Sequence, residues 1–355
     1  MARAPRHSAL SVFQNSRLVG RLDRAASGAI GFRYDGTWLD SPSAFPASLS
    51  LPLRQEPYSG AAVISVFENL LPDDRAIRQR IAGRVGAAGA DAYSLLAAIG
   101  GDCVGALQFL PDGQEPGPAG GIDATEISDD QIAEILSTLA SFPLGLGREN
   151  DFRISLAGAQ EKTALLRRDG RWYRPHGTTA TTHILKPRIG RLPNGMDLSD
   201  SVANEYLCLR LLAAFGLPVA QAEMMDFGLP VLVVERFDRA WARDGRLVRL
   251  PQEDFCQALS VPPSLKYQSE GGPGIRDILD LLKGSDDPFG DVGKVLSAAV
   301  LFWLMGATDG HAKNYSIFLR PGGGFGLAPL YDVLTTQPDV DAGAIPANGF
   351  RMAMS

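Results

Sequence analysis

The sequence predicts an α+β fold of two lobes, in which a mostly β lobe precedes a mostly α-helical one. Two observations support this division. Candidate strands lie close together in residues 151–237, whereas helical patterns dominate residues 238–355. A separate N-terminal part, residues 1–112, combines a small sheet with helices, and residues 113–150 supply a linker and one helix. A chain of 355 residues is long enough for this arrangement of domains.

The N-terminal part begins with a segment of alternating apolar and polar residues, 10–32, which is typical of a small antiparallel sheet. Residues 41–57 are rich in Pro and Ser and predict a connection with several turns. The pattern then becomes helical over residues 66–100. Asp73-Asp74 suits the first turn of a helix, and Gly100-Gly101 ends the pattern.

The next elements follow a loop, because residues 111–121 (PDGQEPGPAGG) have the composition of a flexible domain boundary. A helix opened by Ser128-Asp129 is expected to run to about Ala140. In the two lobes the expected elements are, in chain order, strands at residues 151–155, 162–167 and 183–186, a helix at 201–215, a strand at 230–234, and helices at 252–259, 275–282 and 292–306.

The composition excludes several classes of protein. Lys and Arg number 34 against 40 Asp and Glu, a net charge of -6, which argues against a nucleic-acid-binding surface over the whole molecule. A hydrophobic content of 45% with 21% charged residues is that of an ordinary folded, soluble protein. Cys103, Cys208 and Cys256 are odd in number and far apart, so we expect reduced core thiols rather than disulfides or a zinc site.

Two segments bear on the location of the protein. The longest apolar run, residues 295–305 (VLSAAVLFWLM), is too short to cross a bilayer and predicts a buried core helix. The N-terminal residues MARAPRHSALSVF are basic but lack a sustained apolar region and an export cleavage site. The sequence therefore predicts a cytoplasmic protein that does not associate with a membrane.

The strongest functional signal is an ordered set of two acids and an amide. Asp309 and Asn314 belong to the segment TDGHAKN, and Asp332 follows in PLYD. Protein-kinase-like phosphotransferases use this order, in which the first Asp orients and deprotonates the acceptor hydroxyl while the Asn and the second Asp hold Mg²⁺. Carboxylate and amide oxygens are the hard ligands that Mg²⁺ prefers. The pattern is weak by itself and gains weight from the segments upstream.

Two upstream segments are suited to phosphate binding. Residues 152–163 (FRISLAGAQEKT) place small residues between candidate strands, so backbone N–H groups can approach phosphate oxygens with Lys162 as the countercharge; a tight hairpin turn is the alternative. Lys186 ends an apolar strand, where a kinase lysine reaches the phosphates. Glu205 lies beside the apolar face of the next helix, and pairing with Lys186 would offset the cost of burying its carboxylate. The alternative is that Lys186 and Glu205 are not paired and that both side chains are solvated.

The remaining candidates lie around these segments. Residues 231–238 (VLVVERFD) form an apolar strand that leaves into a polar turn, the position of a kinase hinge whose backbone reads the adenine edge. Glu253 and Asp254 fit the charge preference of a helix N-terminus better than a second acid pair. His311 either contacts phosphate or is a hydrogen-bonded bystander. Ser155 either caps a turn or accepts a phosphoryl group.

Together these motifs resemble the HipA family, the serine/threonine-kinase toxins of bacterial type II toxin–antitoxin pairs. The matching segments keep their order from near the start of the chain to Asp332. They are LSLPL (49–53), FENLLPD (67–73), IGGDCVGA (99–106), ISLAGAQEKT (154–163), THILK (182–186), VERFDR (234–239), LPQED (250–254), KY (266–267), GGPGI (271–275) and GATDGHAKN (306–314).

The resemblance implies a protein-kinase-like fold, the use of ATP and Mg²⁺, and a role for each matched residue. Asp309 would be the catalytic base, Asn314 and Asp332 the metal ligands, and Ser155 the serine whose autophosphorylation expels the nucleotide loop and switches the kinase off. The implied nucleotide-binding residues are Ala157, Gly158, Ala159, Gln160, Glu161, Lys162, Lys186, Glu235, Arg236, Phe237, His311, Ala312, Lys313, Asn314, Tyr331 and Asp332.

The resemblance also implies partners. The family phosphorylates an aminoacyl-tRNA synthetase, glutamate–tRNA ligase in the best-known member, which causes growth arrest and persistence. A small helix-turn-helix antitoxin, HipB, restrains the kinase and binds operator DNA as a dimer. Family members continue beyond the segment that matches residues 350–355, so an incomplete C-terminal lobe is expected. Two alternatives stay open: a truncated, catalytically dead module that binds the antitoxin, and a small-molecule kinase of the aminoglycoside or lipid-kinase type.

Overall fold

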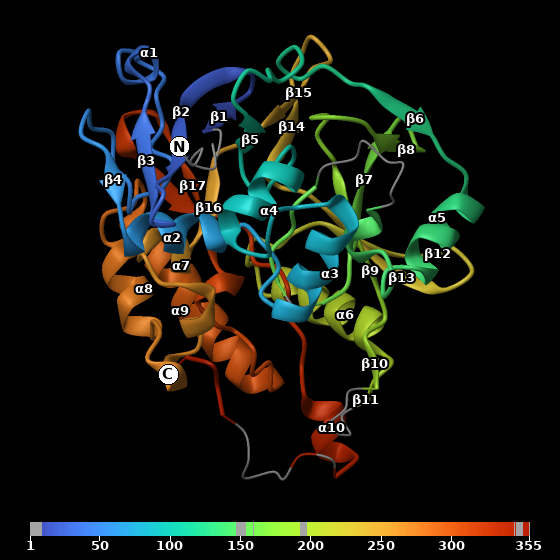
Figure 1. Ribbon diagram of the computed structural model, residues 1–355. Coiled ribbons are helices and arrows are strands. Elements are labelled where there is room, and N and C mark those ends of the chain that lie inside the picture. The colour runs from blue at the N-terminus through green and yellow to red at the C-terminus, as the bar shows by residue number, and fades with distance from the viewer. Residues whose placement is uncertain are drawn as a thin grey trace.

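The computed structural model describes residues 9–146, 154–158, 160–191, 197–343, 345 and 351–354. Figure 1 shows the N-terminal sheet above helices of the C-terminal lobe on one side of the molecule, and a second sheet on the other side. The α+β, two-lobed fold predicted from the sequence is confirmed. The expected division into domains stays a prediction.

The N-terminal part is built on a five-stranded antiparallel sheet in the order β4-β3-β2-β1-β5. The turn between β1 and β2 holds Asn15 and Ser16 with φ of 45° and 64°, values that Asn tolerates better than most residues. The predicted sheet at residues 10–32 is therefore present, and it is extended by two distant strands. The strands are β1 Leu10–Gln14, β2 Arg17–Arg24, β3 Ile30–Tyr34, β4 Tyr58–Ser59 and β5 Leu107–Pro111.

The helical segment predicted at residues 66–100 is three helices rather than one, because capping residues interrupt it. Asp74 caps the second helix by accepting from the backbone N–H of Ile77, and Gly86 ends that helix in the left-handed conformation. Asp91 caps the third. The helices of this part are α1 Gly36–Leu39, α2 Ala61–Glu68, α3 Arg75–Val85 and α4 Ala92–Ile99.

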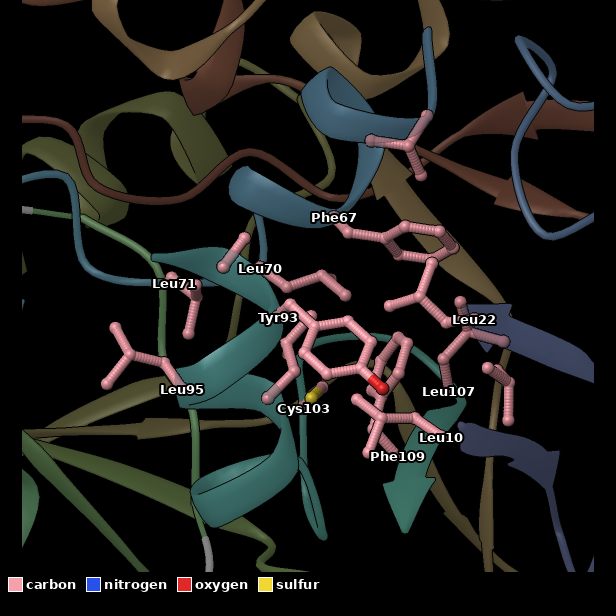
Figure 2. Close-up of a cluster of buried hydrophobic side chains, with 14 of the residues drawn as sticks. Leu10, Leu22, Phe67, Leu70, Leu71, Tyr93, Leu95, Cys103, Leu107 and Phe109 are labelled. Carbon is pink, nitrogen blue, oxygen red and sulfur yellow. The ribbon is translucent and has the colours of Figure 1, made fainter. Parts of the chain in front are cut away.

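One apolar core joins this sheet to its helices. Figure 2 shows Phe67 of α2 and Tyr93 of α4 facing Leu22 and Phe109 of the strands. Phe67 and Phe109 meet edge to face with ring centroids 5.3 Å apart. Leu70 and Leu71, which follow α2, belong to the same core.

The second sheet is antiparallel and six-stranded, in the order β12-β13-β9-β7-β8-β6, and it lies between two helices. Val231 and Val233 of β13 pack with α5, whereas Leu232 and Val234 pack with α6, as the alternation of side chains along a strand requires. The elements are β6 Ala124–Glu126, α5 Asp129–Ser137, β7 Thr163–Arg168, β8 Arg171–Pro175, β9 His183–Pro187, α6 Ser201–Ala214, β12 Ala222–Asp226 and β13 Pro230–Glu235.

Two expectations about this region need correction. The strand expected at residues 151–155 is, within the described residues, an isolated bridge between Ile154 and Asp102 of the N-terminal part; residues 151–153 lie outside the description. Residues 113–150 are more than a linker and helix, because β6 pairs with β8 at the edge of the sheet. The capping box at Ser128 confirms the predicted start of α5.

The C-terminal lobe combines helices with a small sheet, β16-β17-β18. The helix expected at residues 252–259 begins as strand β16, because Asp254 ends that strand and caps the short helix α7. The elements are β14 Arg239–Trp241, β15 Leu247–Arg249, β16 Gln252–Asp254, α7 Phe255–Ala258, α8 Ile275–Leu282, α9 Pro288–Met305, β17 Ser316–Leu319, β18 Phe325–Leu327 and α10 Gln337–Asp341. Short pieces are β10 Gly190–Arg191, β11 Asp197–Leu198 and 3₁₀ turns at Pro143–Gly145, Pro263–Leu265, Gln268–Glu270, Ala312–Asn314 and Pro321–Gly323.

Helix α9 is long and apolar enough to cross a membrane by length and composition, one such helix among the described residues. Its Val295, Ala298 and Phe302 pack in the core of the C-terminal lobe, although most of the helix is not buried. The prediction that this helix is buried is correct only for the face that carries these three residues, because Val300 and Trp303 on the rest of the helix are exposed. The predicted cytoplasmic location stays a prediction.

A buried group of charges fastens the N-terminal part to both lobes. The carboxylate of Asp102, which follows α4, lies 3.2 Å from Arg236, 2.9 Å from Arg239 and 2.9 Å from Arg249. Asp238 pairs with Arg236 at 2.7 Å and with Arg239 at 2.9 Å. All five side chains are almost inaccessible to water, so each charge depends on its partners for stabilisation.

Candidate functional site

The structure brings Asp309, Asn314 and Asp332 together although they come from two loops. Helix α9 ends at Gly306 in the left-handed conformation, and the chain then turns into the 3₁₀ turn that holds Asn314. The amide nitrogen of Asn314 donates to the backbone carbonyl of Asp309 at 2.8 Å and to that of Asp332 at 3.4 Å. Gly310 is required in this loop, because an added Cβ would lie 2.7 Å from the ring of Phe302.

These residues form a donor set that suits a magnesium ion bound to phosphates. Because the nitrogen of Asn314 is used by the backbone carbonyls of Asp309 and Asp332, its amide oxygen is left for a cation. No cluster of three or more His, Cys, Asp or Glu side chains with a metal-ligand arrangement occurs in the described part of the chain. Mg²⁺ commonly needs just one or two carboxylates, since phosphate oxygens and water complete its shell. The residues therefore fit the ion that the sequence implied.

Lys186 on β9 lies between two carboxylates. Its ammonium is 2.8 Å from Glu205 of α6 and 2.7 Å from Asp332. The predicted Lys186–Glu205 pair is therefore present. Burial alone would lower the pKa of Lys186, but Asp332 and Glu205 outweigh it and raise that pKa.

The charge of Asp332 depends on the lysines around it. Burial would raise the pKa of Asp332, whereas Lys186 and Lys162 lower it well below the usual range, so this carboxylate is ionised. Burial raises the pKa of Glu205, and Lys186 offsets part of that effect. Asp332 also has φ of 59°, a conformation that few residues other than Gly, Asn and Asp adopt.

The small-residue loop that begins at Ile154 makes contacts with the N-terminal part as well as with its own lobe. The hydroxyl of Ser155 is buried and donates to the carbonyl of Leu70 at 2.7 Å. The carbonyl of Gly158 accepts from the backbone N–H of Asp73 at 3.2 Å. Gly158 has φ of 101°, and an added Cβ would lie 2.7 Å from the ammonium of Lys162, so Gly is needed here.

Other members of this loop have polar partners at its ends. Gln160 donates to the carbonyl of Pro187 at 3.0 Å, and Glu161 lies 3.2 Å from Arg80. Burial lowers the pKa of Lys162 to about 8, although the nearby Asp332 opposes this. Ala157 is half-buried in the loop, and Ala159 lies outside the described residues.

The hinge candidates differ from one another in where their side chains point. Glu235 ends β13, and its backbone N–H donates to the carbonyl of Gln221. The guanidinium of Arg236 is occupied by the buried carboxylates described above, so its side chain is a structural element of the hinge. The ring of Phe237 lies 5.6 Å from that of Tyr331 and 5.8 Å from that of Phe318, which gives an apolar wall suited to a nucleobase.

Three candidates in the Asp309 loop also have defined places. Burial and the charge of Lys266 lower the pKa of His311 to about 4, so its imidazole is neutral near pH 7. Ala312 is fully buried. The ammonium of Lys313 is buried against Asn69 at 2.7 Å and Asp254 at 3.3 Å, and so bridges to the N-terminal part.

Residues that sequence reasoning left without a role complete this centre. Tyr267 donates to Oδ1 of Asp309 at 2.7 Å, and the neighbouring Lys266 pairs with Asp73 at 2.9 Å. Both segments, KY and FENLLPD, carried the family resemblance but gave no local signal of a role. The contact was not foreseeable from spacing, since Lys266 and Asp73 are 193 residues apart.

A cavity of about 460 Å³ lies away from this centre, between the N-terminal sheet and the turn after β8. Asn15, Gln108, His176 and Arg249 line it, and it shares no residue with the Asp309 centre. The chemistry is therefore assigned to the polar centre and not to this cavity.

Comparisons with known proteins agree with this geometry. Residues 154–355 match the family model of the HipA-like C-terminal domain, and residues 10–110 match that of the HipA N-terminal domain. The chain is 42% identical to the Sinorhizobium fredii protein named "Putative kinase Y4mE" over 98% of this chain and 82% of that protein. It is 29% identical to the serine/threonine-protein kinase toxin HipA of Shewanella oneidensis over 90% of this chain and 73% of that protein.

The solved structures include a similar fold of the whole chain. The complex of Shewanella oneidensis HipA, HipB and operator DNA contains a chain that matches with a TM-score of 0.78 and 26% identity. The match covers 98% of this chain and 79% of that one.

Proposed function

Because the chain belongs to the HipA-like family of serine/threonine-kinase toxins, we propose that it is an ATP-dependent serine/threonine protein kinase whose reaction takes place at the Asp309 centre. The observation that carries the proposal is the meeting of Lys186, Asn314 and Asp332 beside Asp309, with the contacts given above. Protein kinases need this combination of a phosphate-binding lysine, two metal ligands and a base.

Each residue has one task in the proposed reaction. Lys186 and Lys162 hold phosphate oxygens of ATP, and Phe237 with Tyr331 packs on the base. Asn314 and Asp332 would hold Mg²⁺, which when bound neutralises phosphate charge. Burial raises the pKa of Asp309, which favours proton uptake.

The proton and the bonds balance in a single transfer. The acceptor oxygen bonds to the γ-phosphorus of ATP while the bond from that phosphorus to its bridging oxygen breaks, which releases ADP. The acceptor proton passes to a carboxylate oxygen of Asp309. Removing water from the buried centre strengthens these electrostatic interactions.

The regulatory serine fits the same proposal. We take Ser155 to be an autophosphorylation site, as the family resemblance implies. Its hydroxyl is completely buried and bonded to Leu70, so it reaches an active site only when residues 154–162 leave the N-terminal part. A phosphorylated Ser155 would carry charge that is costly to return to this buried position, which supports phosphorylation as an off switch.

The partners follow from the family. The Shewanella oneidensis relative was solved with HipB and operator DNA, and we propose a helix-turn-helix antitoxin of that kind, as a dimer, as the partner of this chain. The proposed substrate is an aminoacyl-tRNA synthetase, whose phosphorylation would arrest growth and promote persistence. We propose that the protein acts in the cytoplasm, without a membrane.

The test is the transfer of labelled phosphate from ATP in the presence of Mg²⁺. The purified chain is expected to label itself and a purified glutamate–tRNA ligase. Asp309→Asn is expected to lower the rate by about a hundredfold or more while nucleotide binding persists. Absence of label on both proteins would support a module that binds the antitoxin without chemistry, and label transferred to aminoglycosides instead would support a small-molecule kinase.

A further inference from the structure

The hydroxyl of Tyr267 makes the bond that an acceptor hydroxyl would make. It donates to Oδ1 of Asp309 at 2.7 Å, and the proposed reaction has not used it. A serine or threonine acceptor must also donate to this carboxylate before its proton is transferred. Because Tyr267 occupies Oδ1, Oδ2 of Asp309 is the oxygen left for the acceptor.

Tyr267 is held in place by contacts other than the one with Asp309. Its ring meets His311 edge to face, with centroids 4.9 Å apart. Its carbonyl accepts from the backbone N–H of Gly272 at 3.0 Å. Gly272 permits this fold of the loop, because an added Cβ would lie 1.8 Å from the carbonyl oxygen of Leu265.

The N-terminal part supplies the second anchor of the same loop. Lys266 pairs with Asp73 at 2.9 Å, and both side chains are largely buried, so this pair is less screened by solvent than a surface pair. Asp73 also lies 3.5 Å from Lys313 of the Asp309 loop. The phenol of Tyr267 is therefore set in position from two sides before any acceptor arrives.

Resting on the proposed function, we propose that Tyr267 is a positioning residue of the acceptor site, whose hydroxyl fixes one oxygen of Asp309 so that the other faces the acceptor hydroxyl. The residue does not touch the acceptor or the phosphates in this role. It orients the base.

A split between rate and affinity separates this role from a purely structural one. Tyr267 contacts the base, and in the proposed role it does not touch the nucleotide. Its loss should therefore lower the rate of transfer and leave nucleotide affinity unchanged.

The first experiment compares Tyr267→Phe with the wild-type chain and with Tyr58→Phe. Tyr58 is a matched control, because its hydroxyl bonds to the carbonyl of Pro52 in the N-terminal part. The maximal rate of self-labelling from ATP is measured, together with nucleotide binding. Tyr267→Phe is expected to lower the maximal rate by about ten- to a hundredfold, with nucleotide affinity unchanged. Tyr58→Phe should leave both quantities unchanged.

The second experiment needs no activity. The side-chain carboxyl carbons of Asp are labelled with ¹³C, and the resonance of Asp309 is assigned by its absence in Asp309→Asn. Its chemical shift at pH 7 is expected to change in Tyr267→Phe, which loses the hydrogen bond to Oδ1, and not in Tyr58→Phe. An unchanged chemical shift in Tyr267→Phe overturns the inference, whether or not the chain is an active kinase.

The outcomes also separate this inference from the proposed function. A wild-type chain without label, or an Asp309→Asn variant as active as wild type, contradicts the proposed function. Tyr267→Phe with a wild-type rate, while Asp309→Asn is inactive, contradicts the positioning role alone. A faster Tyr267→Phe, or phosphate found on Tyr267 itself, also overturns it, because the phenol would then be an obstruction or an acceptor.

Discussion

Replacing Asp102 by Asn removes the charge that three arginines share. The carboxylate accepts from Arg239 and Arg249 through Oδ1, each at 2.9 Å, and from Arg236 through Oδ2 at 3.2 Å. Thr181 donates to the same Oδ2 from its backbone, at 3.0 Å, and from its hydroxyl, at 2.8 Å. The side chain is 1% exposed, so water cannot replace it.

The loss of stability depends on which of the three arginines keep a carboxylate partner in Asp102→Asn. Asp238 still compensates Arg236 and Arg239, but the ion pair of Arg249 within the described residues is with Asp102. Removing one partner of a buried pair typically costs about 3–5 kcal/mol. Since a protein is stable by about 5–15 kcal/mol in total, Asp102→Asn is expected to lose a large share of its free energy of unfolding.

The assay is urea unfolding followed by tryptophan fluorescence and circular dichroism. The matched control is Asp112→Asn, which breaks the exposed pair with Arg21 at 3.4 Å and should cost about 0–1 kcal/mol. Asp102→Asn should also weaken nucleotide binding, because Arg236 belongs to the hinge. A loss below about 1 kcal/mol for Asp102→Asn, with the denaturant slope unchanged, would refute the reasoning.

Three further predictions concern single residues. Ser155→Ala should abolish self-labelling at that position and leave ATP binding largely intact; mass spectrometry that finds the main phosphate on another residue of the wild-type chain would contradict the assignment. Asp332→Asn should weaken Mg²⁺-dependent transfer by about a hundredfold or more yet fold normally, since Asn tolerates the φ of 59°, and an unfolded variant would count against this. Burial raises the pKa of Glu253 to about 8, and Leu49 and Ser48 partly oppose it, so the folded state keeps a proton that the unfolded state has lost. The contribution of Glu253 to the free energy of unfolding is therefore fully present below about pH 4.5, and it is lost as the pH rises to about 8. Glu253→Gln should be more stable than wild type by about 1–3 kcal/mol at pH 8, and no difference between pH 5 and pH 8 would rule out the shift.

Local patterns in the sequence were sufficient for much of the fold and for the outline of the site. Helix α6 and strands β9 and β13 were predicted close to their observed bounds, because α6 has apolar residues at helical spacing and each strand is a short apolar run. The Lys186–Glu205 pair was expected from the cost of burying a lone carboxylate, and the two atoms are 2.8 Å apart. The start of α5 was predicted from its capping residues.

Two of the predictions of secondary structure were wrong, for identifiable reasons. The expected helix at residues 252–259 begins as a strand because β16 pairs with β17, which is more than sixty residues away in the chain. Residues 113–150 were expected to be a linker and a helix, with the composition of a flexible loop at residues 111–121, yet β6 lies between the two and joins the sheet through its pairing with β8. Both errors arise where a distant strand, and not the local sequence, decides the backbone conformation.

The sequence by itself determined the type of fold, the order of the motifs and the chemistry available to them. Only the tertiary structure decided which charge meets which: Lys313 turns to Asn69, Arg236 to Asp102, and Tyr267 to Asp309. The physical reason is that periodicity records whether a residue is buried, whereas the partner of a buried charge is whatever the packing of distant segments brings within a few ångströms.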